Sequence, residues 1–343
     1  MSRRRDPVQR RDDGDVELHD VVEWEPRTVV DRAVFVVYSA ATRGFRVVFV
    51  VFALALLGWQ LAVEAGPLLT DPVVVGFVVL SALPALALVA FVWYADVTTA
   101  APPGLLAVTF LLGLLVVAVA GLLNSVLGGF LGEFLDRYLL ASVATALVFV
   151  LVVAPVEEVV KLLAVHLYAY RSPAFDSVIT GAVFGAAAGL GFATMENAFY
   201  IAQVVTDGPT TTAADGGAIT TVRALVGPGH VIYSAFAGYY LGLARFNRRY
   251  AGPVVLKGLA IAVSLHALYN VLVSTEALHA PGYLVDVFGF SSVAAVFTVV
   301  VAYNGVLTVL LLYKLSQYRA VYRATRDDDP IESELTEFER DVE

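Results

Sequence analysis

The chain has 343 residues, of which 59% are hydrophobic and only 15% are charged, and its mean hydropathy is +0.77. This composition excludes an ordinary soluble globular protein and predicts an all-α polytopic membrane protein. The chain contains no cysteine, which excludes disulfides, thiolate metal ligands and a cysteine nucleophile. The formal net charge of -9 lies largely in the terminal segments, and we expect either two solvated tails or an acid-rich surface suited to a high-salt cytoplasm.

Two polar tails flank a long apolar region. Residues 1–43 carry charges of both signs without a sustained period, so we expect a mostly disordered cytoplasmic tail. Residues 319–343 are expected to form an acidic cytoplasmic tail. The region between them, residues 44–318, is expected to be a transmembrane helical domain whose functional core spans about 138–275.

Apolar runs of membrane-spanning length predict about eight transmembrane helices. They lie at residues 46–63, 73–94, 105–127, 138–169, 177–203, 218–243, 254–275 and 290–314. We expect the first run to be a retained signal anchor, because it lies too far from Met1 and is too long for a cleaved signal peptide.

The distribution of basic residues predicts the orientation of the helices. Basic residues precede the first run and follow the fourth, sixth and eighth, whereas the loops at 64–72, 207–217 and 276–289 contain neither lysine nor arginine. By the positive-inside rule, this pattern predicts that both termini are cytoplasmic.

The fourth run contains a charged segment, Ala154-Pro-Val-Glu-Glu-Val-Val-Lys161. An ionisable group at membrane depth costs at least about 2.5–3.5 kcal/mol, so two carboxylates and an ammonium in one apolar run indicate a site. In a helix Lys161 lies four residues after Glu157 and three after Glu158, so the ammonium can lie over either carboxylate. The alternative interpretation is a structural intramembrane ion pair.

The fourth run is also too long for a straight crossing. A helix from Tyr138 to Tyr170 would be about 50 Å long, whereas the hydrocarbon core is about 30 Å thick. We therefore expect a bend, a strong tilt or an oblique entry, with the break at Pro155 because proline lacks a backbone donor and crowds the preceding turn. A crossing from about Val148 to Tyr170 would bring the carboxylates to the depth of the later polar groups, in a cavity that leans outward.

Three later runs also carry polar groups at membrane depth, and nothing comparable occurs in the first three runs. The fifth run ends with Glu196 and Asn197. The sixth has His230 directly after a Gly-Pro-Gly element that should interrupt the helix. The seventh has His266 and Asn270 four residues apart, on one helical face. Because each unpaired group would cost several kcal/mol in hydrocarbon, we expect all of them to meet around one cavity.

Glycines at four-residue spacing predict that the fifth and sixth runs pack closely, because small residues let helix backbones approach in lipid. They are Gly181, Gly185, Gly189, Gly238 and Gly242.

This set of side chains has the chemistry of hydrolysis. A carboxylate can take a proton from water, and imidazoles can bind a metal or stabilise a developing oxyanion. His166 and His279 are expected to be bystanders, because they lie near the inner interface and in an outer loop.

Four motifs follow one another on four consecutive runs. They are Glu157-Glu158-x-x-Lys161, Gly-Leu-Gly-Phe-Ala-Thr-Met-Glu196-Asn197-x-x-Tyr200, His230 followed by Gly238-Tyr-Tyr-Leu-Gly242, and His266-x-x-x-Asn270. In this order they resemble the PrsW family of intramembrane proteases and, more distantly, the CAAX prenyl endopeptidase and bacteriocin-processing clan. The resemblance covers roughly residues 138–275 and neither tail.

The resemblance implies an intramembrane endopeptidase in which Glu157 and Glu158 hold the catalytic water and Asn270 orients a group or contributes to an oxyanion pocket. Lys161 and Asn197 would be supporting residues. The residues implied to be catalytic are Glu157, Glu158, Glu196, His230, His266 and Asn270.

The resemblance leaves two mechanisms open, because the family is described as metalloprotease while related members are argued to use a glutamate-activated water without metal. The sequence lacks the His-Glu-x-x-His helix of zinc proteases, yet Glu157, His230 and His266 could form a three-ligand Zn²⁺ site with an open position for water. The implied substrate is a membrane-anchored protein, such as an anti-sigma factor or a prenylated or lipidated protein, cleaved in the cell membrane. Membrane lipid is the other expected partner, and no nucleic acid is expected.

Two other classes of function compete with proteolysis. Buried Glu, Lys and His also mark ion pathways, so the runner-up is a proton- or ion-coupled transporter. Transporters commonly have broken helices in corresponding positions of two repeats, whereas here the polar groups all lie in runs four to seven. The third class is a non-catalytic membrane scaffold, for which a missing site residue would be the sign, and none is missing.

Overall fold

Every regular element in the described residues of the computed structural model, 28–64, 71–96, 101–207, 213–274 and 277–327, is a helix. The chain divides into two units, residues 1–52 and 53–343, and each is described by itself. The first helix, α1 (Val29–Glu64), crosses this boundary. All contacts described below lie within the second unit.

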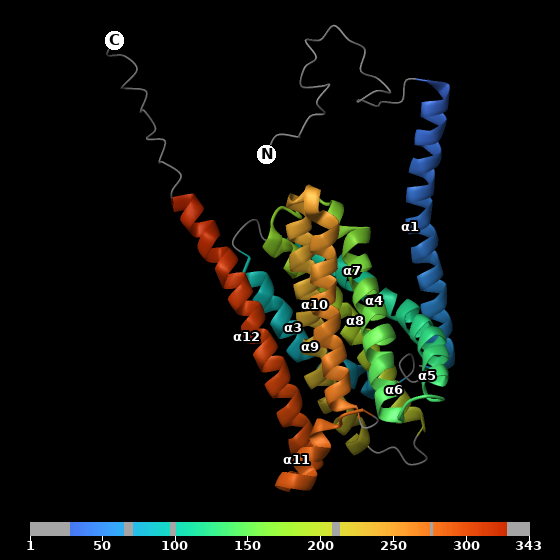
Figure 1. Cartoon of the computed structure of the whole chain (residues 1–343), viewed down its shortest axis with the longest axis vertical. Helices are drawn as coiled ribbons and strands as arrows, with labels where there is room; N and C mark the ends of the chain where they lie inside the picture. Colours follow the sequence, from blue (N-terminus) through green and yellow to red (C-terminus); the bar gives the residue numbers. More distant parts are fainter. Residues whose placement is uncertain (1–27, 65–70, 97–100, 208–212, 275–276, 328–343) are drawn as a thin grey trace. The chain divides into compact units, whose positions relative to one another are not determined.

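The second unit contains long helices joined by short connections and shorter helical turns (Figure 1). The long helices are α3 (Pro72–Tyr94), α4 (Pro103–Leu123), α7 (Ala154–Leu167), α8 (Val178–Asp207), α9 (Ala213–Phe246), α10 (Ala251–Val273) and α12 (Ser292–Asp327). The shorter α-helices are α5 (Gly129–Leu135), α6 (Ala141–Val148) and α11 (Ala280–Phe288). Two π-helical turns, η1 (Asn124–Gly128) and η2 (Phe149–Val153), lead into α5 and α7, and short 3₁₀ turns lie at Ala169–Arg171 and Arg248–Tyr250.

Seven helical stretches of the described residues are long and apolar enough to cross a membrane, which confirms the prediction of an all-α polytopic membrane protein. They are 44–63, 72–94, 103–135, 141–167, 178–205, 248–273 and 292–322. The sixth predicted run corresponds to α9, which is long enough to span but is not among the seven. This helix carries Arg223 and His230 inside the bundle, where both side chains are buried.

Both ends of the helical region extend beyond the predicted tail boundaries. Helix α1 begins at Val29, so residues 29–43 are helical rather than disordered. The reason is that the apolar segment after Pro26 contains no proline or glycine before Gly44 that would end a helix. Helix α12 likewise continues to Asp327. The remaining parts of both tails, 1–27 and 328–343, lie outside the described residues.

Helix α8 lies at the centre of the second unit, between α9 and α4 (Figure 1). Its glycines make this position possible, because a Cβ atom at Gly181, Gly185 or Gly189 would collide with backbone carbonyl oxygens of α9. A Cβ at Gly191 would collide in the same way with the backbone of α4 at Phe110. The predicted close packing of the fifth and sixth runs is thus observed, and it brings the polar residues of α8 next to those of α9.

The irregularity predicted near Pro155 takes the form of a π-helical turn rather than a break. The fourth crossing is helical from Ala141 to Leu167, and η2 occupies residues 149–153 just before the proline. Pro155 follows directly as the second residue of α7, so the π-helical turn lies where the proline's missing backbone donor interrupts the hydrogen bonds of the helix.

The expected interruption at the Gly-Pro-Gly element was wrong, because α9 continues through Pro228 as one helix. Proline inside a membrane helix is tolerated where a neighbouring helix satisfies the backbone groups that it disturbs. Here Asn304 of α12 contacts the neighbouring backbone: its side-chain amide donates a 2.8 Å hydrogen bond to the carbonyl oxygen of Leu225, next to the Ala224 carbonyl that Pro228 leaves without its usual donor. His230 therefore stands on a continuous helix.

Candidate functional site

Helix α7 carries the charged segment into the interior of the second unit. Its position follows from contacts with α4, α8, α9 and α10, and its two glutamates and its lysine are all buried. The Lys161 Nζ atom lies 2.7 Å from Glu158 Oε1 but 3.8 Å from Glu157 Oε2. The ammonium also lies 4.3 Å from the ring centroid of Phe192. The lysine thus forms a close ion pair with Glu158, whereas it lies beyond hydrogen-bond distance of Glu157.

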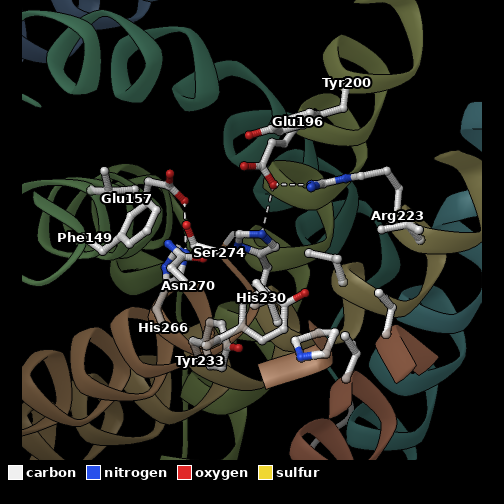
Figure 2. Close-up of a pocket in the computed structure, with 18 of the residues that line it drawn as sticks. Phe149, Glu157, Glu196, Tyr200, Arg223, His230, Tyr233, His266, Asn270 and Ser274 are labelled. Carbon is white, nitrogen blue, oxygen red and sulfur yellow. Dashed lines mark hydrogen bonds and ion pairs between the residues drawn. The ribbon is translucent and has the colours of Figure 1, made fainter. Parts of the chain in front are cut away.

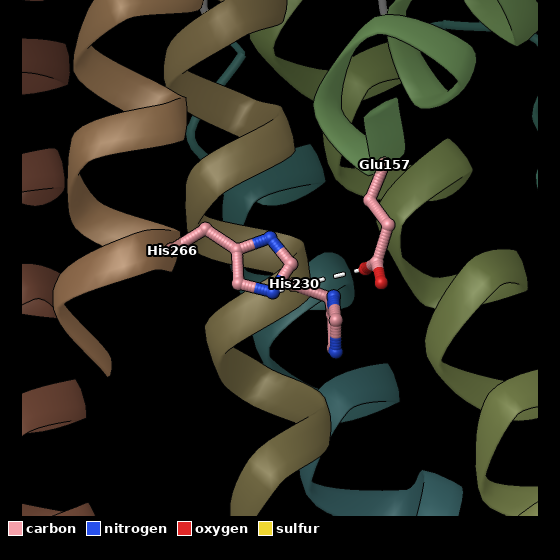
Figure 3. Close-up of side chains that lie close together, drawn as sticks. All are labelled: Glu157, His230 and His266. Carbon is pink, nitrogen blue, oxygen red and sulfur yellow. Dashed lines mark ion pairs between the residues drawn. The ribbon is translucent and has the colours of Figure 1, made fainter. Parts of the chain in front are cut away.

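Two histidines from α9 and α10 complete this cluster (Figure 3). His266 Nδ1 lies 2.8 Å from Glu158 Oε1, and its Nε2 lies 3.7 Å from Glu157 Oε2. His230 Nδ1 lies 2.9 Å from Lys161 Nζ. The two imidazole rings are 5.1 Å apart, centroid to centroid.

These contacts determine whether the Nδ1 atom of each imidazole donates or accepts a hydrogen bond. An ammonium has only donors and a carboxylate has only acceptors. His230 Nδ1 must therefore accept from Lys161, whereas His266 Nδ1 must donate to Glu158. The proton of His230 is then on Nε2, which lies 3.0 Å from Glu196 Oε2.

Helix α8 contributes Glu196, which is neutralised by a residue that the sequence analysis missed. Arg223 Nη2 lies 2.5 Å from Glu196 Oε2, and Arg223 Nε donates a 2.8 Å hydrogen bond to Asn197 Oδ1. Its guanidinium also lies over the ring of Tyr200, 4.3 Å from the centroid. Arg223 is only 8% exposed. The signal was a charge within the sixth apolar run, the same criterion that drew attention to Lys161.

His230 joins this ion pair to the cluster on α7, because its Nε2 lies 3.0 Å from Glu196 Oε2. The result is a continuous chain of close polar contacts in which cationic and anionic groups alternate around the two imidazoles. Its members, in spatial order, are Arg223, Glu196, His230, Lys161, Glu158 and His266.

The third crossing also contributes to the site, although the sequence shows polar motifs only in runs four to seven. The side-chain amide of Asn124, the first residue of η1, donates a 3.1 Å hydrogen bond to Glu157 Oε1. Ser81 of α3 contributes indirectly, because it accepts a 3.0 Å hydrogen bond from Asn197. An asparagine or serine alone in an apolar run gives little signal in the sequence, which explains why both were missed.

A cavity of about 420 Å³ lies against this cluster (Figure 2). Glu157 faces it from one side and Arg223 from the other, with both histidines between them. Valines of α9, α10 and α12 form much of its apolar wall. The predicted catalytic residues that line it are Glu157, Glu196, His230, His266 and Asn270.

The remaining predicted residues stand behind the cavity rather than in its wall. Among the described residues that line it, Glu158, Lys161 and Asn197 are absent, and each contacts a side chain that does line it. His279, expected to be a bystander, is part of the lining near Ser274. His166 instead borders a separate apolar groove, where it stacks on Tyr170.

Glu157, His230 and His266 form a donor set for a metal ion, because one ligand atom from each lies within 4.8 Å of the others. Zinc bonds of about 2.0–2.2 Å would require the donors to move closer by roughly 1 Å. Glu157 Oε2 fits this role, since it is buried and accepts no hydrogen bond. His266 Nε2 fits as well, and its Nδ1 contact with Glu158 is typical of a histidine ligand. Both nitrogens of His230 are engaged, so this residue would have to release Lys161 or Glu196 to bind a metal.

The fold and the site together define a polytopic membrane protein with carboxylates and imidazoles gathered at an internal cavity, a set of groups suited to hydrolysis. Residues 101–305 match the family described as "PrsW family intramembrane metalloprotease". This match covers more than half of the chain, so the chain belongs to that family, as its motifs predicted.

Curated relatives give the same result. "Protease PrsW" of Halalkalibacterium halodurans is 32% identical over 123 residues, which cover 36% of this chain and 53% of the relative. "Protease PrsW" of Geobacillus kaustophilus is 30% identical over 118 residues, which cover 34% of this chain and 48% of the relative. The chain spans about half the length of the curated relatives it matches. No solved structure matches the chain.

The buried ion pair between Arg223 and Glu196 leads to a stability prediction. Arg223→Met should lower the free energy of unfolding by about 3–5 kcal/mol, because it leaves a buried carboxylate without its cationic partner. The double variant Arg223→Met/Glu196→Gln should recover much of this loss, since neither charge then remains. Unfolding of the detergent-solubilised protein would measure both effects.

The exposed pair between Arg137 and Glu133 provides the control, because these side chains are 63% and 76% exposed. Arg137→Met should change the free energy of unfolding by at most about 1 kcal/mol. Equal, small losses at the two arginines would show that the Arg223 pair is not buried as described.

Proposed function

We propose that this chain is an intramembrane endopeptidase that hydrolyses a peptide bond of a membrane-anchored protein. The observation that carries the proposal is the meeting of Glu157, Glu196, His230 and His266 at one internal cavity. Membership of the PrsW family and the names of the curated relatives support the same activity. They do not favour the transporter hypothesis.

Glu157 is the proposed general base. Its Oε2 atom accepts no hydrogen bond, and the residue lines the cavity in which a water molecule and the peptide would meet. The carboxylate takes a proton from water as the water oxygen bonds to the carbonyl carbon. The C–N bond then breaks, and the proton passes to the leaving nitrogen.

The other residues hold this arrangement. Glu158 fixes the ring of His266, and Lys161 joins Glu158 to His230. Asn270 lines the cavity, and we assign its side-chain amide to the oxyanion that develops on the carbonyl oxygen. Asn197 has a supporting role, because it accepts a hydrogen bond from Arg223 and thereby helps to hold Glu196.

In a metal-dependent form of this reaction, Glu157, His230 and His266 would hold the metal ion. Bound Zn²⁺ would polarise the scissile carbonyl and make water more acidic. A metal-free form relies on Glu157 alone to activate water. Both forms of the mechanism agree with the structure, because Glu157 Oε2 accepts no hydrogen bond and could therefore bind a metal or take a proton from water.

The proposed setting is the cell membrane, with both termini in the cytoplasm, as the distribution of basic residues predicts. Seven apolar stretches of the described residues are long enough to cross the membrane, and the substrate would approach within the bilayer. An anti-sigma factor or a prenylated or lipidated protein remains the proposed kind of substrate. The domain limits, with a protease domain at 44–318 and its core at 138–275, also remain a proposal.

Substitution of the cavity residues tests the proposed activity. Glu157→Gln and His266→Ala should each reduce cleavage of a co-expressed single-span reporter at least about 100-fold, because each removes a group that acts at the reacting water. Immunoblots of the reporter and of the protein would measure cleavage and accumulation.

Matched controls use the same residue types outside the cavity. Glu133→Gln, at the exposed pair with Arg137, and His166→Ala, beside Tyr170, should leave cleavage unchanged. Full cleavage by both Glu157→Gln and His266→Ala would refute the proposed activity.

Removal of metal separates the two forms of the mechanism. If the ligands are Glu157, His230 and His266, the purified protein should contain about one zinc per chain, and chelation should abolish cleavage until zinc is restored. His266→Ala should lose the bound zinc, as measured by elemental analysis. An active protein without zinc that chelators do not inhibit would exclude the metal-dependent form.

A further inference from the structure

We propose that Asn124 is a positioning residue for Glu157, an inference that rests on the proposed function. Asn124 is far from the glutamate in sequence and belongs to the third crossing, yet its side-chain Nδ2 lies 3.1 Å from Glu157 Oε1. Through this hydrogen bond it directs the other carboxylate oxygen, Oε2, toward the cavity and His266.

The two adjacent glutamates differ in their hydrogen bonds, and only Glu157 depends on Asn124 for one. Glu158 Oε1 is held by two groups, Lys161 Nζ and His266 Nδ1, at 2.7 and 2.8 Å. The same two residues lie 3.8 and 3.7 Å from Glu157 Oε2, beyond hydrogen-bond distance. Among the described residues, Asn124 is therefore the one hydrogen-bond donor to the side chain of Glu157.

The orientation of the Asn124 amide follows from the chemistry of its partner. A carboxylate only accepts, so the amide must present its NH₂ group to Glu157, and the carbonyl oxygen Oδ1 points the other way. Oδ1 is buried and has no hydrogen-bond partner. Most buried polar atoms are satisfied, and one that is not calls for a reason. Holding the glutamate in a working orientation provides one.

The local backbone also departs from regular helix at this residue. Asn124 begins the π-helical turn η1, which ends at Gly128. Such turns widen the helix and change the directions of its side chains, and they occur frequently at functional sites. A Cβ atom at Gly128 would lie 3.5 Å from Val148 and 3.9 Å from Val152, so η1 packs on the segment that leads into α7. The departure thus occurs where the third crossing faces Glu157.

Kinetics of purified variants test this inference. Asn124→Leu keeps the size of the side chain but removes the donor, so kcat should fall about 10- to 100-fold while KM changes less than about threefold. Asn124→Gln retains the amide donor on a longer arm and should recover at least about tenfold in kcat over Asn124→Leu. Gln60→Leu is the matched control. It removes another amide hydrogen bond to the same crossing, from Gln60 to the carbonyl oxygen of Ala118, and should leave kcat unchanged.

An infrared measurement gives a readout that does not depend on activity. The carboxylate band of Glu157 is identified by its loss in Glu157→Gln. It should shift in Asn124→Leu and stay in place in Gln60→Leu, because only the first variant removes its hydrogen bond. A shift supports the positioning role even if the protein has no peptidase activity, in which case only the proposed function fails.

Two results would overturn the inference. One is an unshifted Glu157 band in Asn124→Leu. The other is a wild-type kcat in Asn124→Leu when Glu157→Gln is inactive, since catalysis would then require Glu157 but not its hydrogen bond with Asn124.

Discussion

Burial of the charges on α7 is the constraint on which the rest of the structure depends. Glu158 and Lys161 are both fully buried inside a bundle of largely apolar helices. Neither charge could remain there alone, since removing one partner of a buried pair costs several kcal/mol. Their 2.7 Å contact offsets that cost, and the remaining acceptor and donor capacity recruits His266 and His230. The site is thus assembled outward from one ion pair.

Close helix packing makes this assembly possible. The glycines of α8 allow the backbone of α9 to approach, which places Glu196 within reach of His230 and Arg223. The two π-helical turns also lie next to polar contacts, because η1 begins at Asn124 and η2 leads into the segment that carries Pro155 and Glu157. Departures from regular helix therefore coincide with the polar contacts.

The sequence predicted the elements that have a strong local signal. Apolar runs marked the membrane helices, and charges or histidines inside those runs marked Glu157, Glu196, His230 and His266. The convergence of these side chains followed because unpaired polar groups are costly in lipid. The family followed from the order of the motifs.

The missed features depend on contacts between distant segments. Pro228 does not interrupt α9, and Asn304 of a later helix donates a hydrogen bond to the nearby backbone. Asn124 gains its role only through a glutamate 33 residues away. Arg223 could have been found from its charge within an apolar run, but its partner, Glu196, required the packing of α8 on α9. A single sequence contains no signal for such pairs.

The central claim is that the buried charges border a cavity that water can enter, and the absence of cysteine from the chain allows a direct test. Ser274→Cys and Val226→Cys place single thiols in the cavity wall, and Val309→Cys places one on an exposed apolar face of α12. In lipid nanodiscs, a water-soluble maleimide should modify both cavity thiols much faster than the thiol at position 309, because the reactive thiolate forms only where water is present. Cavity thiols that react no faster than the one at position 309 would contradict the claim.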